Sequence, residues 1–499
     1  MERALPNYKP KVNIDFGNDL IHEVPSYNIP GMGCCAVYST LQKPVYKPMI
    51  RLSAHRSFGW RCANMFPQHV FPETAEINSQ EHLVLGGCDT LDLAQEHGTP
   101  VYILDEATLR NRCRSFVQEF SQRYTNVQVL YASKAYINPA LAQIINEEGL
   151  GLDVVSGGEL AVARAAGFPL ENVYFHGNNK TPEELSEAVE HGLGKVVVDS
   201  FHELDLLNRI AAEAGKVQDI LIRVSPGIDP HTHIYTTTGI IDSKFGFSIQ
   251  TGHAADAIHQ ALVAPNLRLL GLHFHLGSPI FELEPYQAAT DLVLRFAAQY
   301  QEEGLEIQEF SPGGGFAIAY TEDQIPPTIG EYAEAIVSTL TATCGELSMP
   351  APKLLIEPGR SIVGPAGVAL YRVGAIKDIP GVRKYVSVDG GMGDNIRPAL
   401  YQATYEVVSA GKVNGTPTEK VTIAGKYCES GDVLASDIML PCPETGDIIA
   451  IPAAGAYCPS MASNYNMNPR PPMVLVHNGQ SRTIRRRESY QDLMLCDSV

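Results

Sequence analysis

The sequence has no long apolar run, and this limits where the chain can act. No stretch approaches the ~20 apolar residues that a helix needs to cross a bilayer. The N-terminal residues also lack a basic start followed by an apolar segment, so a secretory signal peptide is not expected. We therefore expect neither a membrane protein nor a secreted one.

Basic charge is scarce as well. The chain has 37 Lys and Arg against 56 Asp and Glu, which gives a formal net charge of -19. A nucleic-acid-binding protein needs a basic surface to neutralise phosphates, so we expect no nucleic-acid partner. The 499 residues are 44% hydrophobic and contain no low-complexity tract, which predicts an ordinary globular protein with two domains.

Cysteines at the paired spacing of a zinc site are absent too. The ten cysteines are scattered along the chain, and only Cys34 and Cys35 are adjacent. In a chain of this length, such a pattern indicates free thiols in a reducing compartment. The expected location is the cytoplasm, or a plastid if the source is a plant or an alga.

Periodicity divides the chain into four parts. Residues 1–80 mix Pro, Asn, His and aromatic residues with little periodicity, and we expect an extension of unknown role. Residues 81–124 are expected to form a strand and helix segment that joins a β domain. Strand-like and helix-like segments alternate regularly over residues 125–365, and short strand-like runs fill residues 366–499.

The alternating part contains eight strand-like apolar runs. In 139–149, between the first two, apolar residues recur at helical spacing, and in 181–189 a Thr cap precedes a Pro and early glutamates. Eight strands that alternate with helices predict an α/β fold built on a parallel (β/α)8, or TIM, barrel. The predicted strands are 127–132, 151–155, 173–176, 195–198, 220–224, 269–275, 307–311 and 353–356.

Polar and glycine-rich residues follow the ends of these runs. Enzymes with this barrel place their chemistry at the C-terminal ends of the strands. The convergence therefore predicts an active site at that face. The residues concerned are Lys134, Asp153, His176, His275-Leu-Gly-Ser278, Gly313-Gly-Gly315 and Glu357-Pro-Gly-Arg360.

The runs after Arg360 are short, β-rich and separated by Gly, Pro and Asn. They predict a C-terminal all-β domain. The segment 99–105 is predicted to be a strand that precedes the barrel and pairs with this domain. The C-terminal runs are 367–374, 385–388, 420–423 and 472–476.

Single residues leave alternatives open. Lys134 could cap a strand and reach solvent, or its amine could act as a nucleophile when neutral, which partial burial favours. Glu357 could form a surface salt bridge with Arg360. His273 and His275 lie two positions apart, a spacing that can serve a metal, but no cysteine or carboxylate follows nearby and we expect no metal site.

Six motifs occur together in one order. They are Tyr131-Ala-Ser-Lys134-Ala, Asp153-Val-Val-Ser-Gly-Gly-Glu159, His273-Phe-His-Leu-Gly-Ser278, Glu357-Pro-Gly-Arg360, Cys428-Glu-Ser-Gly-Asp432 and Gly455-Ala-Tyr457. Over residues 95–495, this set resembles the fold type III, alanine-racemase-like decarboxylases that depend on pyridoxal 5'-phosphate. Within that group it is most similar to the diaminopimelate decarboxylase family, which converts meso-2,6-diaminopimelate to L-lysine and carbon dioxide in the last step of lysine biosynthesis.

The resemblance implies a set of cofactor contacts. Lys134 would hold pyridoxal phosphate covalently through its amine, and Glu357 would face the pyridine nitrogen and keep it protonated. His275 would lie against the ring, with His273 packed beneath. The remaining implied contacts are Asp153, Gly359 and Arg360 and, at the phosphate, Ser278, Gly313, Gly314, Gly315 and Tyr457.

The resemblance also implies substrate contacts. Arg360, Arg397 and Tyr401 match the family's carboxylate-binding positions, with Tyr457 also at the substrate, and arginine can hold a carboxylate in a bidentate manner. Glu429 would bind the distal amine. Ornithine and arginine decarboxylases of this fold bind a purely cationic tail, and such an enzyme would have no use for Arg397.

Cys428 is implied to return a proton to the α-carbon after carbon dioxide leaves. In the family, the loop of Cys428 and Glu429 reaches across from a second subunit, so a homodimer with shared sites is expected. Three alternatives stay open: a decarboxylase of another basic amino acid or carboxynorspermidine, a racemase, and a cofactor-binding regulatory homologue without catalysis. The Cys428-Glu429 pair disfavours the racemase, and Lys134 together with Cys428 disfavours the inactive homologue.

Four residues at three places depart from the family pattern. Pro279 follows the Gly-Ser pair where a polar residue is usual, and Tyr136 stands where Asn is common. Cys458-Pro459 replaces a commoner Gly-Phe pair after Tyr457. None of these is a member of the implied catalytic set.

Overall fold

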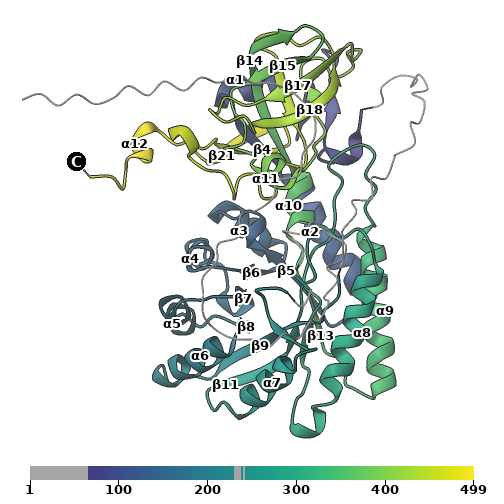
Figure 1. Cartoon of the computed structure of the whole chain (residues 1–499), viewed down its shortest axis with the longest axis vertical. Helices are drawn as coiled ribbons and strands as arrows, with labels where there is room; N and C mark the ends of the chain where they lie inside the picture. The colour runs from purple at the N-terminus through teal and green to yellow at the C-terminus, as the bar shows by residue number, and fades with distance from the viewer. Residues whose placement is uncertain (1–65, 230–237, 240–241, 499) are drawn as a thin grey trace, which may run out of the picture. The chain divides into compact units, whose positions relative to one another are not determined.

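Figure 1 shows the computed structural model of the chain, which describes residues 66–229, 238–239 and 242–498. Most of the expected N-terminal extension, with Cys34 and Cys35, lies outside the described residues. The part that follows forms a short 3-10 turn and a small antiparallel sheet. These elements are η1 (Gln68–Val70), β1 (Glu76–Ile77), β2 (Leu83–Leu85) and β3 (Cys88–Asp89).

Eight parallel strands form a closed barrel, and the predicted fold class is confirmed. Neighbouring strands pair in the order β9-β11-β12-β13-β5-β6-β7-β8, and β8 pairs with β9 to close the ring. A short strand, β10 (Phe247–Ser248), pairs with β9 outside this ring. The barrel strands are β5 (Val127–Ala132), β6 (Gly151–Val154), β7 (Val173–Phe175), β8 (Lys195–Val198), β9 (Gln218–Ser225), β11 (Leu267–His273), β12 (Glu309–Ser311) and β13 (Lys353–Ile356).

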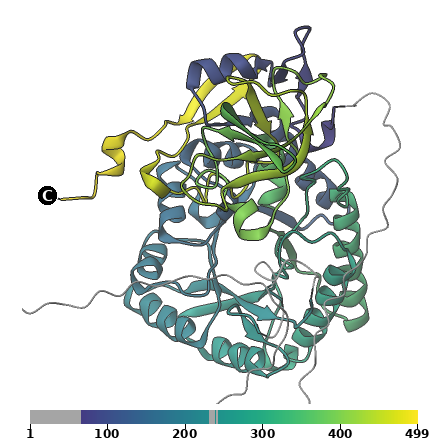
Figure 2. The same cartoon turned by 45° about the horizontal axis from the view of Figure 1, so that its top comes forward.

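Helices connect the strands and surround them (Figure 2). The helix predicted at 181–189 begins where expected, because the Thr181 hydroxyl accepts the Glu184 N–H and the Glu184 carboxylate accepts the Thr181 N–H. The helices of this part are α2 (Glu106–Ser121), α3 (Pro139–Glu147), α4 (Gly157–Ala165), α5 (Pro182–Glu190), α6 (Phe201–Glu213), α7 (His253–Val263), α8 (Glu284–Ala298) and α9 (Ile329–Leu347), with the short turns η2 (Ser133–Ala135), η3 (Leu170–Asn172) and η4 (Gln301–Glu303).

Successive residues of a barrel strand alternate between two cores. Val196 and Val198 of β8 belong to the main core, together with helix residues such as Leu185, while Val197 belongs to a small separate cluster. Because neighbouring strand residues point to opposite faces, the small cluster faces the barrel interior. Its members are Leu130, Tyr174, Val197, Leu221 and Leu355, from β5, β7, β8, β9 and β13.

A sheet-rich domain follows the barrel, with strands in the order β18-β17-β15-β14-β4-β20-β21. The prediction for the segment 99–105 is confirmed, since β4 pairs antiparallel with β14 and parallel with β20. The strands are β4 (Val101–Asp105), β14 (Gly367–Ile379), β15 (Arg383–Val388), β16 (Val408–Ser409), β17 (Glu419–Ala424), β18 (Val433–Leu440), β19 (Ile448–Ile451), β20 (Met473–His477) and β21 (Gln480–Arg485). The other helices and turns are α1 (Thr90–His97), α10 (Arg360–Ala366), α11 (Arg397–Tyr401), η5 (Tyr465–Met467) and α12 (Tyr490–Leu493).

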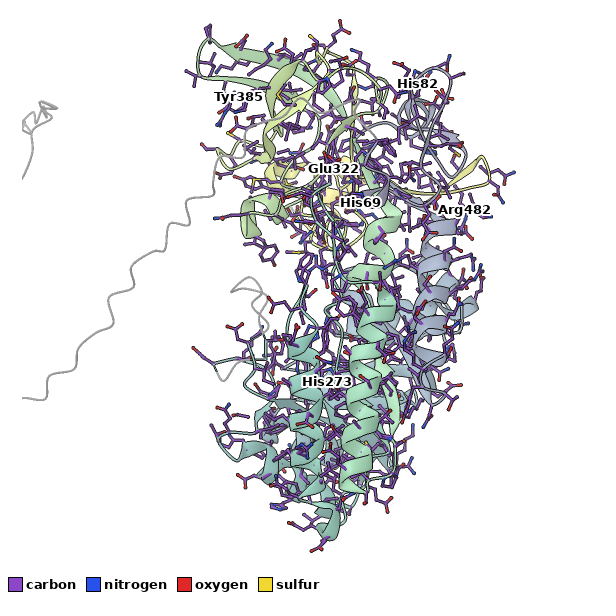
Figure 3. The ribbon with its side chains drawn as sticks, turned by 90° about the vertical axis from the view of Figure 1, so that its right-hand side faces the viewer. His69, His82, His273, Glu322, Tyr385 and Arg482 are labelled. Atoms are coloured by element: carbon purple, nitrogen blue, oxygen red, sulfur yellow. The ribbon has the colours of Figure 1, made fainter. Side chains whose placement is uncertain are left out.

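The sheet-rich domain meets the barrel at η2, which carries Lys134. The backbone N–H of Tyr457 donates to the Ala135 carbonyl at 2.8 Å, and the Ser460 hydroxyl donates to the same oxygen at 3.0 Å. Figure 3 views the chain from another side, with His273 labelled in the barrel and Tyr385 in the sheet-rich domain. Residues from the C-terminal domain therefore come directly beside the end of the first barrel strand.

No helix within the described ranges is long and apolar enough to cross a bilayer. The seven cysteines in those ranges are all free thiols, which agrees with the sequence prediction for that part of the chain.

The interior cluster makes a stability prediction. Leu355→Ala removes a fully buried side chain from the cluster and should lower the free energy of unfolding by about 2–5 kcal/mol. Val263→Ala, at a side chain that is 80% exposed on α7, is the matched control and should change it by less than about 0.5 kcal/mol. Urea unfolding followed by circular dichroism measures both, and equal midpoints for the two variants would refute the interior packing.

Candidate active site

A polar layer lies at the C-terminal end of the barrel interior. Four of its members stand two residues after a residue of the interior cluster, so they point to the same side: His176, Asp199, Arg223 and Glu357. The strand register supports this, because Ala132 pairs with Asp153, and His273 pairs with both Arg223 and Ser311. The layer consists of Asp153, His176, Asp199, Arg223, His273, Ser311 and Glu357, all buried.

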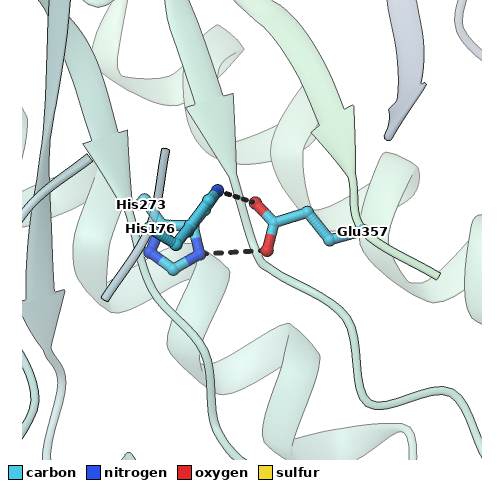
Figure 4. Close-up of side chains that lie close together, drawn as sticks. All are labelled: His176, His273 and Glu357. Atoms are coloured by element: carbon cyan, nitrogen blue, oxygen red, sulfur yellow. Dashed lines mark hydrogen bonds and ion pairs between the residues drawn. The ribbon is translucent and has the colours of Figure 1, made fainter. Parts of the chain in front are cut away.

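Within this layer, the carboxylate of Glu357 faces His273 and His176 (Figure 4). The Ser311 hydroxyl donates to Oε1 of Glu357 at 2.6 Å, and Nε2 of His273 lies 3.2 Å from Oε2. Nε2 of His176 lies 3.8 Å from Oε1. Glu357 makes no surface salt bridge with Arg360 in the described structure, so that alternative is wrong.

The surroundings of Glu357 keep it ionised. Burial alone raises the pKa of Glu357. His273, His176 and the Ser311 hydroxyl lower it by more than this, so the pKa lies well below its usual value. Burial in turn lowers the pKa of His273, and that of His176 well below the usual value, although Glu357 raises both. Glu357 is therefore an ionised carboxylate that the Ser311 hydroxyl and the two nearby imidazoles stabilise.

The same three residues meet the distance requirement of a metal site. Donor atoms of His176, His273 and Glu357 lie within 4.8 Å of one another. This grouping differs from the His273 and His275 pair that the spacing suggested, because Nδ1 of His275 accepts the Gly314 N–H at 3.2 Å. The expectation of no metal stays a prediction.

Lys134 lies at the opening of the polar layer. Its Nζ is 3.9 Å from Oδ2 of Asp153, and 39% of its side chain is exposed, toward the cavities described below. Burial lowers the pKa of Lys134, but Asp153, Tyr457 and Glu357 raise it more, so its pKa is above the usual value. Burial does favour a neutral amine, as expected, but the nearby negative charge outweighs desolvation, so Lys134 is charged at neutral pH.

Asp153 is the buried partner of Lys134. Neither of its carboxylate oxygens has a hydrogen-bond partner among the described residues. Burial raises the pKa of Asp153 to about 7, although Lys134 opposes this. A buried carboxyl with two unused oxygens is suited to a polar group of a ligand.

A cavity of about 390 Å³, here called the outer cavity, lies at the barrel mouth. A smaller inner pocket adjoins it and is lined by Glu357, Gly315 and Gly359 among others. Five residues line both spaces. They are Lys134, His275, Ser278, Arg360 and Tyr457.

The three consecutive glycines permit close backbone packing beside the inner pocket. A Cβ on Gly314 would lie 2.1 Å from the Glu357 carbonyl oxygen, and one on Gly315 would lie 2.3 Å from that of Gly277. Gly313 N–H donates to the Ser311 hydroxyl at 3.0 Å and Gly314 N–H to His275. Two of the three amides are thus used within the protein, and Gly315 is the glycine of this triplet that lines the pocket.

The outer cavity contains two buried arginines. Arg360 and Arg397 are each 6% exposed, and both line the cavity together with Tyr401. Nε of Arg360 donates to the Ser278 hydroxyl at 3.1 Å. Among the described residues, neither guanidinium forms an ion pair with a carboxylate, so their charge is available to an anionic ligand.

Two predicted residues lie elsewhere. Cys428 and Glu429 are exposed, and neither is among the described residues that line the outer cavity or the inner pocket. The Cys428 N–H donates to Oδ1 of Asn466 at 2.9 Å. One chain therefore does not bring this pair to its own Lys134 cavity.

Sequence reasoning missed several members of the site. Ser311 and the roles of His176 and Arg223 could have been found by following the strand alternation to the C-terminal end of each predicted run. Tyr320, which lines the outer cavity, had no such signal because it follows β12 in an irregular segment. The unusual Pro279 also lines the outer cavity, beside Ser278.

Comparisons with known proteins agree with this geometry. A family model for the pyridoxal binding domain of pyridoxal-dependent decarboxylases matches residues 106–364. Diaminopimelate decarboxylase of Bacillus subtilis is 47% identical over 85% of this chain and 97% of its own, and that of Synechocystis is 44% identical over 87% and 93%. The crystal structure of diaminopimelate decarboxylase from M. jannaschii with L-lysine matches with a TM-score of 0.81 and 36% identity, over 87% of this chain and 99% of that one.

The raised pKa of Asp153 predicts how stability depends on pH. The Asp153 carboxyl keeps its proton up to about pH 7 in the folded protein, but only up to about pH 4 in the unfolded chain. The stability that the protonated carboxyl contributes is therefore lost as the pH rises through 7. Asp153→Asn has no such proton to lose. The free energy of unfolding of the variant relative to wild type should therefore rise by roughly 2–4 kcal/mol from pH 5 to pH 8.5. Denaturant unfolding at both pH values measures this.

Asp378→Asn, at a side chain that is 61% exposed, is the control and should show no such difference. A pH-independent difference between Asp153→Asn and wild type would contradict the raised pKa.

Proposed function

Because the chain belongs to the diaminopimelate decarboxylase family of pyridoxal-dependent enzymes, we propose that it converts meso-2,6-diaminopimelate to L-lysine and carbon dioxide. The observation that carries this proposal is the cavity that joins Lys134 to two buried arginines without carboxylate partners among the described residues. A lysine provides the cofactor linkage, and the arginines suit a substrate that keeps a second carboxylate.

The residues around Lys134 fit pyridoxal phosphate. The unused oxygens of Asp153 and the ionised Glu357 provide acceptors for a protonated aromatic nitrogen and a ring hydroxyl. When bound, the cofactor supplies an electron sink for the pair of electrons left when carbon dioxide departs. Glu357 would hold the proton on the pyridine nitrogen, and His275 would lie against the ring.

The phosphate would lie among the other predicted cofactor residues. Ser278, Gly315, Gly359, Arg360 and Tyr457 line the inner pocket and support this placement. We retain Gly313 and Gly314 as residues that shape the backbone there, since their amides donate within the protein.

Lys134 must lose a proton before its amine can act as a nucleophile, because its pKa is raised. Asp153 is 3.9 Å away and would accept that proton, although the higher pKa of Lys134 keeps the proton mainly on the amine. Asp153 would therefore prepare the amine as well as contact the cofactor.

The substrate would occupy the outer cavity. Arg360, Arg397 and Tyr401 would bind its distal carboxylate, with Tyr457 beside them. A site built around two buried cations disfavours ornithine and arginine, whose side chains end in a cation.

We also propose a homodimer with shared active sites. Cys428 and Glu429 lie outside the cavities of their own chain, so both would serve the site of a second copy. There, the Cys428 thiol would donate a proton to the α-carbon, and Glu429 would bind the distal amine.

Substrate choice is tested directly by carbon dioxide release. Wild-type protein should decarboxylate meso-diaminopimelate with a kcat/KM at least about 100-fold above that for ornithine, arginine or carboxynorspermidine. Turnover of ornithine but not diaminopimelate would refute the proposal. If no substrate is turned over although the protein shows the visible absorbance of lysine-bound cofactor, the regulatory homologue is favoured. Lys134→Ala is the control, and it should lose this absorbance.

Mixing two inactive variants tests the shared site. Lys134→Ala and Cys428→Ala each damage a different half of every site, so each homodimer should have little activity. Random exchange of subunits gives half heterodimers with one intact site each, so activity should recover to about a quarter of wild type. No recovery after verified subunit exchange would contradict a site shared between two chains.

A further inference from the structure

Tyr320 contacts both arginines of the outer cavity. Its hydroxyl accepts a hydrogen bond from Nη1 of Arg360 at 2.5 Å. Its ring lies under the guanidinium of Arg397, whose Cζ is 4.8 Å from the ring centroid. One phenol therefore links two cationic groups that otherwise repel each other.

Tyr405 holds Arg397 from a second direction. Its hydroxyl accepts a hydrogen bond from Nη1 of Arg397, and the same oxygen lies 3.5 Å from Sγ of Cys458. The rings of Tyr320 and Tyr405 meet edge to face, 5.2 Å apart at 81°. Tyr405 is only 4% exposed and does not line the outer cavity, so it acts behind the arginine.

The backbone joins the two tyrosines as well. Glu406 N–H donates to the Tyr320 carbonyl at 2.7 Å, and Glu322 N–H donates to the Glu406 carboxylate at 3.0 Å. These bonds connect the loop after β12 to the segment after α11. The position of Arg397 is thereby tied to the barrel that carries Arg360.

The choice of phenols has a chemical consequence. A carboxylate in the place of either tyrosine would orient an arginine equally well, but it would also neutralise the arginine and compete with an anionic ligand. A phenol hydroxyl accepts only one of the five N–H groups of a guanidinium. With the bond to Ser278 counted as well, three N–H groups remain on Arg360, and four remain on Arg397. Both arginines are thus oriented while their charge is preserved.

We propose that Tyr320 and Tyr405 are positioning residues that hold Arg360 and Arg397 as one clamp for the carboxylate that the substrate retains. This rests on the proposed function, since it assigns the distal carboxylate to these arginines. Tyr320 sets the spacing between the two guanidiniums, and Tyr405 fixes the plane of Arg397. The clamp should therefore recognise the carboxylate of a ligand and be indifferent to its amines.

Two product-like ligands separate this role from a general effect on the cavity. L-lysine and 1,5-diaminopentane differ only in one carboxylate, and their binding to the cofactor-loaded protein can be measured by calorimetry. Tyr405→Phe removes only the hydroxyl and should weaken L-lysine binding about tenfold, while diaminopentane binding stays within about twofold. Tyr320→Phe should behave in the same way.

Steady-state kinetics give a second readout. With meso-diaminopimelate, KM should rise about tenfold in either variant while kcat changes less than about threefold, because the chemistry at Lys134 is untouched. In the double variant, the loss should be smaller than the product of the single losses, since both hydroxyls serve one clamp. Tyr124→Phe, which removes a hydroxyl that donates to the Pro352 carbonyl, is the matched control and should leave all values unchanged.

Equal weakening of L-lysine and diaminopentane would overturn the positioning role, because it would indicate a damaged cavity. Unchanged L-lysine binding in both variants would overturn it too. Failure of the wild-type protein to decarboxylate meso-diaminopimelate would refute the proposed function instead. The ligand comparison would still decide the positioning role, since it measures binding and not turnover.

Discussion

The buried carboxylate of Glu357 is the constraint on which the active site depends. Removing a carboxylate from water is unfavourable unless protein donors replace the lost hydrogen bonds. Here Ser311 and His273 contact it at 2.6 and 3.2 Å, and His176 lies further away at 3.8 Å. These residues come from or directly follow four different strands, so the carboxylate can be stabilised only when the barrel is closed in this register. The requirement connects the fold to the chemistry of the aromatic ring that Glu357 is proposed to face.

The cationic side chains at the mouth of the barrel have two kinds of partner. Lys134 faces the carboxyl group of Asp153, which raises the pKa of the amine and has a raised pKa of about 7 itself. Arg360 and Arg397 instead face the neutral hydroxyls of Ser278, Tyr320 and Tyr405 and keep their full charge. The first arrangement suits an amine that must become a nucleophile, and the second suits a site that must bind an anion.

Much of this was predictable from the sequence, and the exceptions have physical reasons. The eight strands and the positions of Lys134 and Glu357 followed from apolar runs and the polar residues after them. The effect of Asp153 on the pKa of Lys134 was not predictable, because the distance between the two residues depends on the pairing of β5 with β6. Tyr320 and Tyr405 were missed because they lie in irregular segments that only tertiary packing brings together. The place of Cys428 follows from family resemblance, since no pattern within one chain relates it to Lys134.

The most direct test of this account is the protonation state of the bound cofactor. Protein loaded with pyridoxal phosphate that carries ¹⁵N in its ring can be measured by nitrogen NMR. The account predicts a protonated pyridine nitrogen in the wild-type protein, and loss of that proton in Glu357→Gln, where the carboxylate charge is gone. An unprotonated nitrogen in the wild-type protein, or an unchanged signal in Glu357→Gln, would contradict it.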